Sequence, residues 1–285
     1  MMYNFPIGVM AESFGLDTKS AVLKAKELGA NGLQMYCARG HNAPENLTKD
    51  KRKELLDFVK SNGLQFSAIC GDMGRGFHNR EQNAELIQRS KEIMELAKEL
   101  ESDIVTTHIG VIPSDPHHDR YKIMQEACFE LAEFADSMGS HFAIETGPET
   151  SLTLKGFLDG LGTKGVAVNL DPANLVMVAG DDPVLAVYNL KDYIVHTHAK
   201  DGIKKFHCDP ELVYGIRQPM GEEEISKGAF EEMPLGEGKV DFPAYIKALD
   251  DIGYKGFLTI ERKCGDNPSE DIKSAMTFLK SIISN

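Results

Sequence analysis

The chain has 285 residues, of which 42% are hydrophobic and 26% are charged, a composition typical of globular proteins rather than of disordered or fibrous ones. Its net charge of −13, from 44 acidic and 31 basic residues, disfavours nucleic acid and anionic membrane surfaces as partners. No stretch approaches the roughly 18 consecutive apolar residues that a membrane span requires.

The cysteines indicate the compartment. There are 5 of them and none belongs to a Cys-x-x-Cys pair, so the sequence predicts neither a disulfide framework nor a cysteine-based zinc site. Unpaired cysteines fit a reducing compartment, and the first residues lack the basic region of a signal peptide. We therefore expect a cytoplasmic protein.

Short apolar runs alternate with longer stretches of helical periodicity along the chain. The runs predict eight strands, at residues 5–10, 32–36, 64–69, 103–109, 142–146, 166–170, 193–198 and 256–260. The other stretches predict eight helices, at residues 17–28, 49–61, 81–100, 119–138, 153–161, 183–190, 242–250 and 269–281. Asp17 is placed to cap the first of these helices, and Gly29 is placed to end it.

Strands that are joined by helices pair in parallel, because a parallel pair needs a long crossover. An open nucleotide-binding sheet is disfavoured, since residues 8–15 lack the Gly-x-Gly-x-x-Gly pattern. The sequence therefore predicts an α/β protein, a (β/α)8 TIM barrel that spans residues 1–285 as a single domain. Residues 202–236, between strand seven and its helix, exceed the usual loop length, which predicts a functional insertion or a contact between subunits of a homo-oligomer.

Metal-competent side chains stand at the carboxyl ends of the last four predicted strands. They are Glu145, Asp171, His198 and Glu261. The active sites of such barrels lie at this rim, and three carboxylates there repel one another unless a positive charge is present. Three oxygen ligands and one imidazole suit a divalent metal ion, with Mn²⁺ preferred and Mg²⁺, Co²⁺ or Zn²⁺ as alternatives.

Other polar side chains are predicted near the same rim. Lys200 shares a strand face with His198 and is placed to reach a substrate oxygen, whereas His196, deeper on that face, is interpreted as a packed histidine. His108 ends strand four. It is interpreted either as a substrate or second-ion ligand or as a packed side chain.

The sequence resembles the xylose isomerase-like TIM barrels, in particular their sugar phosphate isomerase and epimerase group. The resemblance is specific from about residue 140 to the end, and before that it depends on the barrel periodicity and on Thr107-His-Ile-Gly110. The stretches that carry it are Ile144-Glu-Thr-Gly147, Asn169-Leu-Asp-Pro-Ala-Asn-Leu175, Val195-His-Thr-His-Ala-Lys-Asp201, Pro234-Leu-Gly-Glu-Gly238 and Thr259-Ile-Glu-Arg262.

The resemblance implies that the four rim residues hold one divalent ion and that Glu145 and Glu261 also move protons. It implies a small sugar or sugar phosphate as substrate. One carboxylate would take the proton beside a ketose carbonyl, and after an enediolate the other would return it, which gives an epimerase or an isomerase. Some epimerases of the family carry a histidine three residues after the strand-six aspartate. This chain has Asn174 there, and we assign Asn174, His108 and Lys200 to substrate binding.

Three other functions remain open from the sequence. A metal-dependent dehydratase of the inosose or dehydroshikimate type would use the same ligands and then expel a hydroxyl group. An apurinic-site endonuclease is disfavoured, because its three-metal site needs more histidines and because the net charge is −13. A barrel that binds sugar without turnover would have a broken ligand set, and this set is intact.

Overall fold

The computed structural model describes residues 3–217, 228–262 and 265–284. Its centre is a closed barrel of parallel strands in the order β1-β10-β7-β6-β5-β4-β3-β2. The barrel closes where Ile7 pairs with Leu258 on one side and Gly8 pairs with Gly32 on the other. The barrel strands are β1 (Ile7–Met10), β2 (Gly32–Tyr36), β3 (Gln65–Cys70), β4 (Ile104–Thr107), β5 (His141–Glu145), β6 (Val166–Leu170), β7 (Ile194–Ala199) and β10 (Leu258–Ile260).

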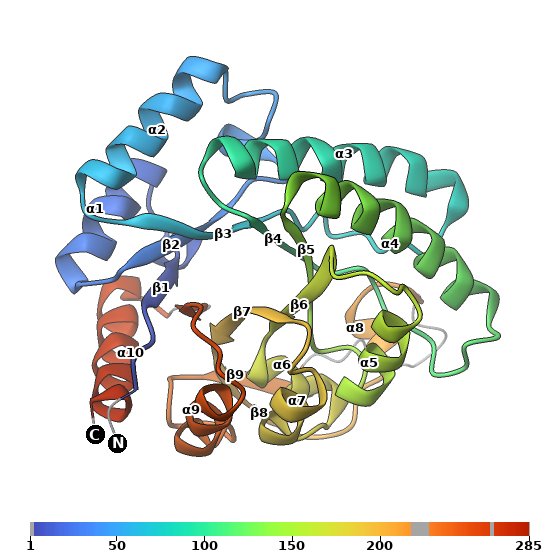
Figure 1. Ribbon diagram of the computed structural model, residues 1–285. Coiled ribbons are helices and arrows are strands. Elements are labelled where there is room, and N and C mark those ends of the chain that lie inside the picture. The colour runs from blue at the N-terminus through green and yellow to red at the C-terminus, as the bar shows by residue number, and fades with distance from the viewer. Residues whose placement is uncertain (1–2, 218–227, 263–264, 285) are drawn as a thin grey trace.

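Helices surround the barrel, as Figure 1 shows, and the predicted (β/α)8 fold is confirmed. The main helices are α1 (Thr18–Leu28), α2 (Lys49–Ser61), α3 (Arg80–Glu99), α4 (Asp119–Met138), α5 (Ser151–Asp159), α7 (Pro183–Asn189), α9 (Phe242–Asp251) and α10 (Pro268–Ile283). Short turns of helix lie between them: η1 (Ala11–Phe14), η2 (Gly40–Asn42), α6 (Pro172–Asn174), the π-helical η3 (Leu175–Ala179) and α8 (Pro210–Val213). No helix in the described part of the chain has the length and hydropathy of a membrane span.

Local sequence signals explain where α1 and α5 begin. Asp17 accepts a hydrogen bond from the backbone N–H of Ser20 at 3.1 Å, and Gly29 ends α1 in the left-handed conformation at a φ of 77°. Helix α5 begins two residues before its predicted start at 153, because the Thr150 hydroxyl accepts the N–H of Thr153 and so caps an earlier turn. The helix positions were therefore predicted well, and their ends follow the capping residues.

The predicted insertion at residues 202–236 contains regular structure. Strand β8 (Asp201–Lys204) continues from β7 and pairs antiparallel with β9 (Phe230–Met233), and α8 lies between them in sequence. Residues 218–227 of the insertion lie outside the described residues. The sequence analysis expected a loop here, and the hairpin was missed because its strands have no clear apolar alternation.

One buried carboxylate fixes both ends of this insertion. Asp201, which is 1% exposed, accepts hydrogen bonds from four backbone N–H groups at 2.8 to 3.0 Å, those of Gly202, Gly236, Gly238 and Val240. A Cβ atom at Gly238 would lie 2.1 Å from Asp201 Oδ1, so only glycine allows this approach. The Pro234–Gly238 motif thus returns the chain to the carboxyl end of β7.

Candidate metal centre

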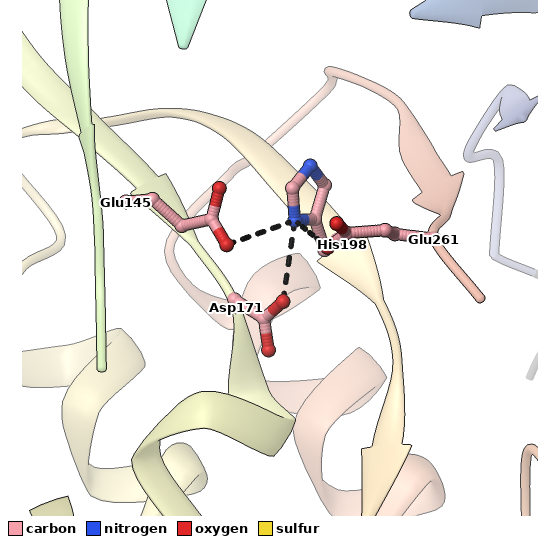
Figure 2. Close-up of side chains that lie close together, drawn as sticks. All are labelled: Glu145, Asp171, His198 and Glu261. Atoms are coloured by element: carbon pink, nitrogen blue, oxygen red, sulfur yellow. Dashed lines mark hydrogen bonds and ion pairs between the residues drawn. The ribbon is translucent and has the colours of Figure 1, made fainter. Parts of the chain in front are cut away.

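Four adjacent strands bring the predicted metal-competent residues to one place. The strands β10, β7, β6 and β5 are consecutive neighbours in the barrel. Glu145 ends β5, Asp171 follows β6, His198 lies in β7 and Glu261 follows β10. Each offers a ligand atom, and these four atoms lie within 4.8 Å of one another. Figure 2 shows the three carboxylates converging on one nitrogen of the imidazole ring, with Glu145 and Glu261 on opposite sides of it.

The distances centre on one ring nitrogen. His198 Nδ1 lies 3.0 Å from Glu261 Oε2, 3.2 Å from Asp171 Oδ2 and 3.7 Å from Glu145 Oε1. Asp171 and His198 are fully enclosed, whereas the Glu261 side chain is 26% exposed. The cluster is therefore buried on the barrel side and reachable at Glu261.

The charges in the cluster strongly perturb its titration. Burial raises the pKa of Glu145, against the opposing charges of His108 and His198. Burial also favours the neutral form of Glu261, but the charges of Lys200 and His198 outweigh it and hold the pKa of Glu261 well below its usual range. For His198 burial lowers the pKa, yet the surrounding carboxylates outweigh this and raise it well above its usual value. The pKa of His198 thus reports the negative charge of the carboxylates around it.

This charge fits a divalent cation. Lys200 Nζ lies 3.1 Å from Glu261 Oε2 and 3.6 Å from Asp171 Oδ2, so one lysine accompanies three carboxylates at the edge of the cluster. With the imidazole neutral, two negative charges remain, and a divalent ion balances them. Three oxygen donors and one imidazole nitrogen form a ligand set that suits Mn²⁺, Mg²⁺, Co²⁺ or Zn²⁺. The residues present could therefore hold a metal ion.

Amide side chains hold Glu145 in place. Asn174 Nδ2 donates to Glu145 Oε1 at 2.9 Å, and Asn169 Nδ2 lies 3.3 Å from Glu145 Oε2. Asp171 in turn accepts the backbone N–H of Asn174 at 2.9 Å, as the cap of the short helix α6. Asn174, which the sequence analysis assigned to the substrate, is thus bonded to a candidate ligand, and its contact with substrate stays a prediction.

The structure places the other predicted residues beside the cluster. His108 lies one residue beyond the end of β4, with Nε2 at 3.5 Å from Glu145 Oε1 and its ring against that of Tyr214 at 5.1 Å. His196 is buried inside the barrel, where Nε2 contacts Gln34 Oε1 at 3.0 Å and Nδ1 has no hydrogen-bond partner. His196 therefore lies within the barrel as expected, although only one of its nitrogens is satisfied.

A cavity of about 250 Å³ opens beside the cluster. Gln34 and Tyr214 line this cavity, and Asn169 contacts Glu145 and His198 beside it; the sequence analysis assigned no role to any of the three. Gln34 and Asn169 are polar residues inside apolar strand runs, a signal that could have found them, whereas Tyr214 lies in the insertion and carried none. Beyond the metal-competent residues, the cavity is lined by polar Gln34, Asp72, His108, Asn174, Lys200 and Tyr214 and by apolar Met10, Cys70, Met177, Val178, Val213 and Phe230.

Known proteins share this fold and parts of this sequence. An inosose dehydratase from Lacticaseibacillus casei is 25% identical over 179 residues, which cover 60% of this chain but only 58% of that protein. A putative L-ribulose-5-phosphate 3-epimerase from Haemophilus influenzae is 24% identical over 221 residues, or 76% of this chain and 72% of that one.

Solved structures match over nearly the full length. A xylose isomerase domain protein from Planctomyces limnophilus superposes with a TM-score of 0.78 at 23% identity, covering 98% of this chain and 97% of that one. The IolI protein, solved with a bound zinc atom, superposes with a TM-score of 0.75 at 16% identity, covering 98% of both chains. A sequence model of the xylose isomerase-like TIM barrel matches residues 22–282. The chain therefore belongs to the xylose isomerase-like TIM barrel family.

Proposed function

We propose that the protein is a divalent-metal-dependent isomerase or epimerase of a sugar or sugar phosphate. The observation that carries this proposal is the pair of glutamates that flank the candidate metal centre. Glu145 and Glu261 approach His198 from opposite sides, as Figure 2 shows, and both carboxylates border the 250 Å³ cavity. Two carboxylates on opposite sides of one small substrate are what removal and return of a proton on its two faces requires.

The residues divide the work as follows. Glu145, Asp171, His198 and Glu261 hold the ion, and Mn²⁺ is the metal we prefer among those that the ligand set accepts. When bound, the divalent ion supplies Lewis acidity that lowers the pKa of the proton beside a ketose carbonyl. One glutamate carboxylate accepts that proton and the other delivers a proton to the opposite face or to the neighbouring carbon. Delivery to the same carbon inverts it, and delivery to the neighbour converts a ketose to an aldose.

Three side chains would orient the sugar. Lys200 and His108 line the cavity next to Glu261 and Glu145, at 3.1 and 3.5 Å respectively. Asn174 lines it too and keeps the carboxylate of Glu145 in one direction through its hydrogen bond. We assign His108, Asn174 and Lys200 to contacts with substrate hydroxyl groups.

A metal-dependent dehydratase is the second candidate. The curated relative from Lacticaseibacillus casei is an inosose dehydratase, and the putative epimerase from Haemophilus influenzae matches at nearly the same identity. The same ligands and the same carboxylate base serve elimination of a hydroxyl group, so the geometry of the cluster alone does not separate the two reactions.

One experiment tests both candidates. The purified protein is loaded with Mn²⁺ and incubated in D₂O with a panel of ketoses, ketose phosphates and cyclic keto-polyols. Deuterium beside the carbonyl, together with a new epimer or aldose, is the result we expect. Loss of water seen by mass spectrometry would instead establish the dehydratase. If no member of the panel gains deuterium or loses water, both candidate reactions are contradicted, and a barrel that binds sugar without turnover is the interpretation left.

We further propose that residues 1–285 act as one catalytic domain in the cytoplasm, with 202–236 as its insertion. Residues of the insertion, Val213, Tyr214 and Phe230, line the same cavity as three of the metal-competent residues, which supports one functional unit. The substrate would be a small molecule and not nucleic acid or membrane lipid. Whether the insertion also joins subunits of a homo-oligomer is decided by sedimentation equilibrium of the full chain.

A further inference from the structure

A glutamine on the opposite wall of the barrel contacts the imidazole of the candidate metal centre. Gln34 belongs to β2 and is 1% exposed. Its Oε1 lies 3.0 Å from Nε2 of His198 and 3.0 Å from Nε2 of His196. Its Nε2 donates to the Thr106 hydroxyl in β4 at 3.0 Å. One buried amide thus joins β2, β4 and β7 across the barrel interior.

These contacts decide which ring nitrogen of His198 carries a proton. In the structure the Nε2 group of Gln34 donates to the Thr106 hydroxyl, and Oε1 faces the two imidazoles. A carbonyl oxygen only accepts hydrogen bonds, so the ring nitrogen facing it must carry a hydrogen. The Nε2–H form of His198 leaves a lone pair on Nδ1, the nitrogen on which the three carboxylates converge.

The amide of Asn169 would favour the other tautomer of His198, with the proton on Nδ1. Asn169 Nδ2 lies 3.2 Å from His198 Nε2, where it would donate to an unprotonated nitrogen. That form would point an Nδ1–H bond at the position a cation needs. The Gln34 contact is shorter, at 3.0 Å, and Asn169 also directs its amide nitrogen to Glu145 Oε2. The hydrogen bond of His198 Nε2 to Gln34 is therefore favoured over the one to Asn169.

We propose that Gln34 is a positioning residue for the metal centre, which holds His198 in the tautomer that presents the Nδ1 lone pair to the ion. This inference rests on the proposed metal site. His196 strengthens it, because a second imidazole on the same oxygen prevents Gln34 from turning away, and the two rings stand at 88° to each other. Partners of this kind around metal-binding histidines typically change metal affinity by about 10- to 100-fold when removed.

The test compares metal affinity and tautomer in matched variants of the full chain. Gln34→Leu removes the acceptor at similar volume, Gln34→Glu restores an acceptor, and Gln65→Leu makes the same change at an exposed position in β3. The dissociation constant for Zn²⁺ is measured by chelator competition, and the protonation of His198 by ¹⁵N NMR of the zinc-loaded protein. We expect Gln34→Leu to weaken Zn²⁺ binding about 10- to 100-fold, Gln34→Glu to bind at least as tightly as the parent protein, and Gln65→Leu to change nothing.

The outcomes separate this inference from the proposed function. If the parent protein binds no Zn²⁺ or Mn²⁺, the metal site itself fails. If it binds but Gln34→Leu keeps both the affinity and the Nε2–H tautomer, only the role of Gln34 is overturned. Thermal unfolding in chelator shows whether Gln34→Leu folds. If it does not, Thr106→Val replaces it, since this change removes the hydroxyl that accepts from the Gln34 amide and should weaken Zn²⁺ binding several-fold. An unchanged affinity in Thr106→Val would then count against the proposal.

Discussion

The two halves of the barrel contribute different chemistry to the same cavity. Strands β5, β6, β7 and β10 end in or next to the four metal-competent residues. Strands β1 to β4 instead offer Met10, Gln34, Cys70 and His108 to the cavity, and Thr106 hydrogen-bonds to Gln34. The second half thus supplies ligands, while the first half supplies the wall and the hydrogen bonds that orient one ligand. Burial raises the pKa of the Cys70 thiol well above its usual value, so this residue of the wall is not a nucleophile.

The largest expected effect comes from the carboxylates of the second half. Glu145→Gln and Glu261→Gln each keep the shape of the site but remove a proton acceptor and a charged ligand. We expect each to lower kcat by about 10³-fold or more, measured as deuterium exchange with the active ketose. Cys70→Ser, in the same cavity but on the first half, should stay within a few-fold of the parent. A Cys70→Ser variant as inactive as the glutamate variants would remove the distinction between the halves.

Removing the metal ion should lower the stability of the protein, because the ligands of the second half are then left without a cation. The three carboxylates repel one another without a cation, and an ion bound only by the folded state adds about 2.7 kcal/mol at a hundredfold excess over its dissociation constant. We expect exhaustive chelation to abolish turnover and to lower Tm by several degrees, and Mn²⁺ to restore both. The Asp171→Asn variant should show a smaller chelator-induced shift in Tm. Full activity after chelation would refute the metal-centred proposal.

The sequence predicted the elements and the metal-competent residues but not the residues that support them. The eight strands and eight main helices could be identified because most have a strong apolar period and a capping residue, as Asp17 shows for α1, although the helix predicted at 153–161 had a weaker pattern. The four metal-competent residues were found because strand ends converge by topology. Gln34 was not found, since its partner His198 is 164 positions away and only the closed barrel brings them together. Tyr214 was missed because only the fold brings it against His108, and the β8–β9 hairpin was missed because its ends are fixed by hydrogen bonds to Asp201 that link distant positions.

A substitution at Asp201 tests whether this carboxylate fixes the insertion to the end of β7. Asp201→Asn replaces one carboxylate oxygen with a donor that faces backbone N–H groups, so buried donors lose their acceptor. We expect a loss of about 3 kcal/mol in the free energy of unfolding, measured by urea denaturation. Asp209→Asn, at the half-buried cap of α8, is the matched control and should cost less than about 0.5 kcal/mol, because asparagine caps a helix about as well as aspartate. Equal losses in the two variants would show that Asp201 does not fix the insertion.

The smallest expected effect concerns a buried acid outside the cluster. Glu149 is 8% exposed, and burial raises its pKa to about 8, with one backbone hydrogen bond from Ile112 acting against it. The folded state therefore binds more protons than the unfolded chain between the usual carboxyl pKa of about 4.3 and about 8. Glu149 lines a second cavity, separate from the one at the metal centre, and the other titratable or charged groups that line it are Asp115, His118, Arg120 and Glu211.

Because the folded state holds the extra proton, the contribution of Glu149 to stability falls as pH rises through this window. Glu149→Gln should match the parent at pH about 5 and exceed it by about 2 kcal/mol at pH about 8.5, seen as Tm against pH. Glu95→Gln, at an exposed position of α3 in the first half, should shift Tm little at either pH. If both variants gave the same profile of Tm against pH, the burial of Glu149 would not be the cause of the pH dependence. The buried acid of the second half would then behave like an exposed acid of the first half.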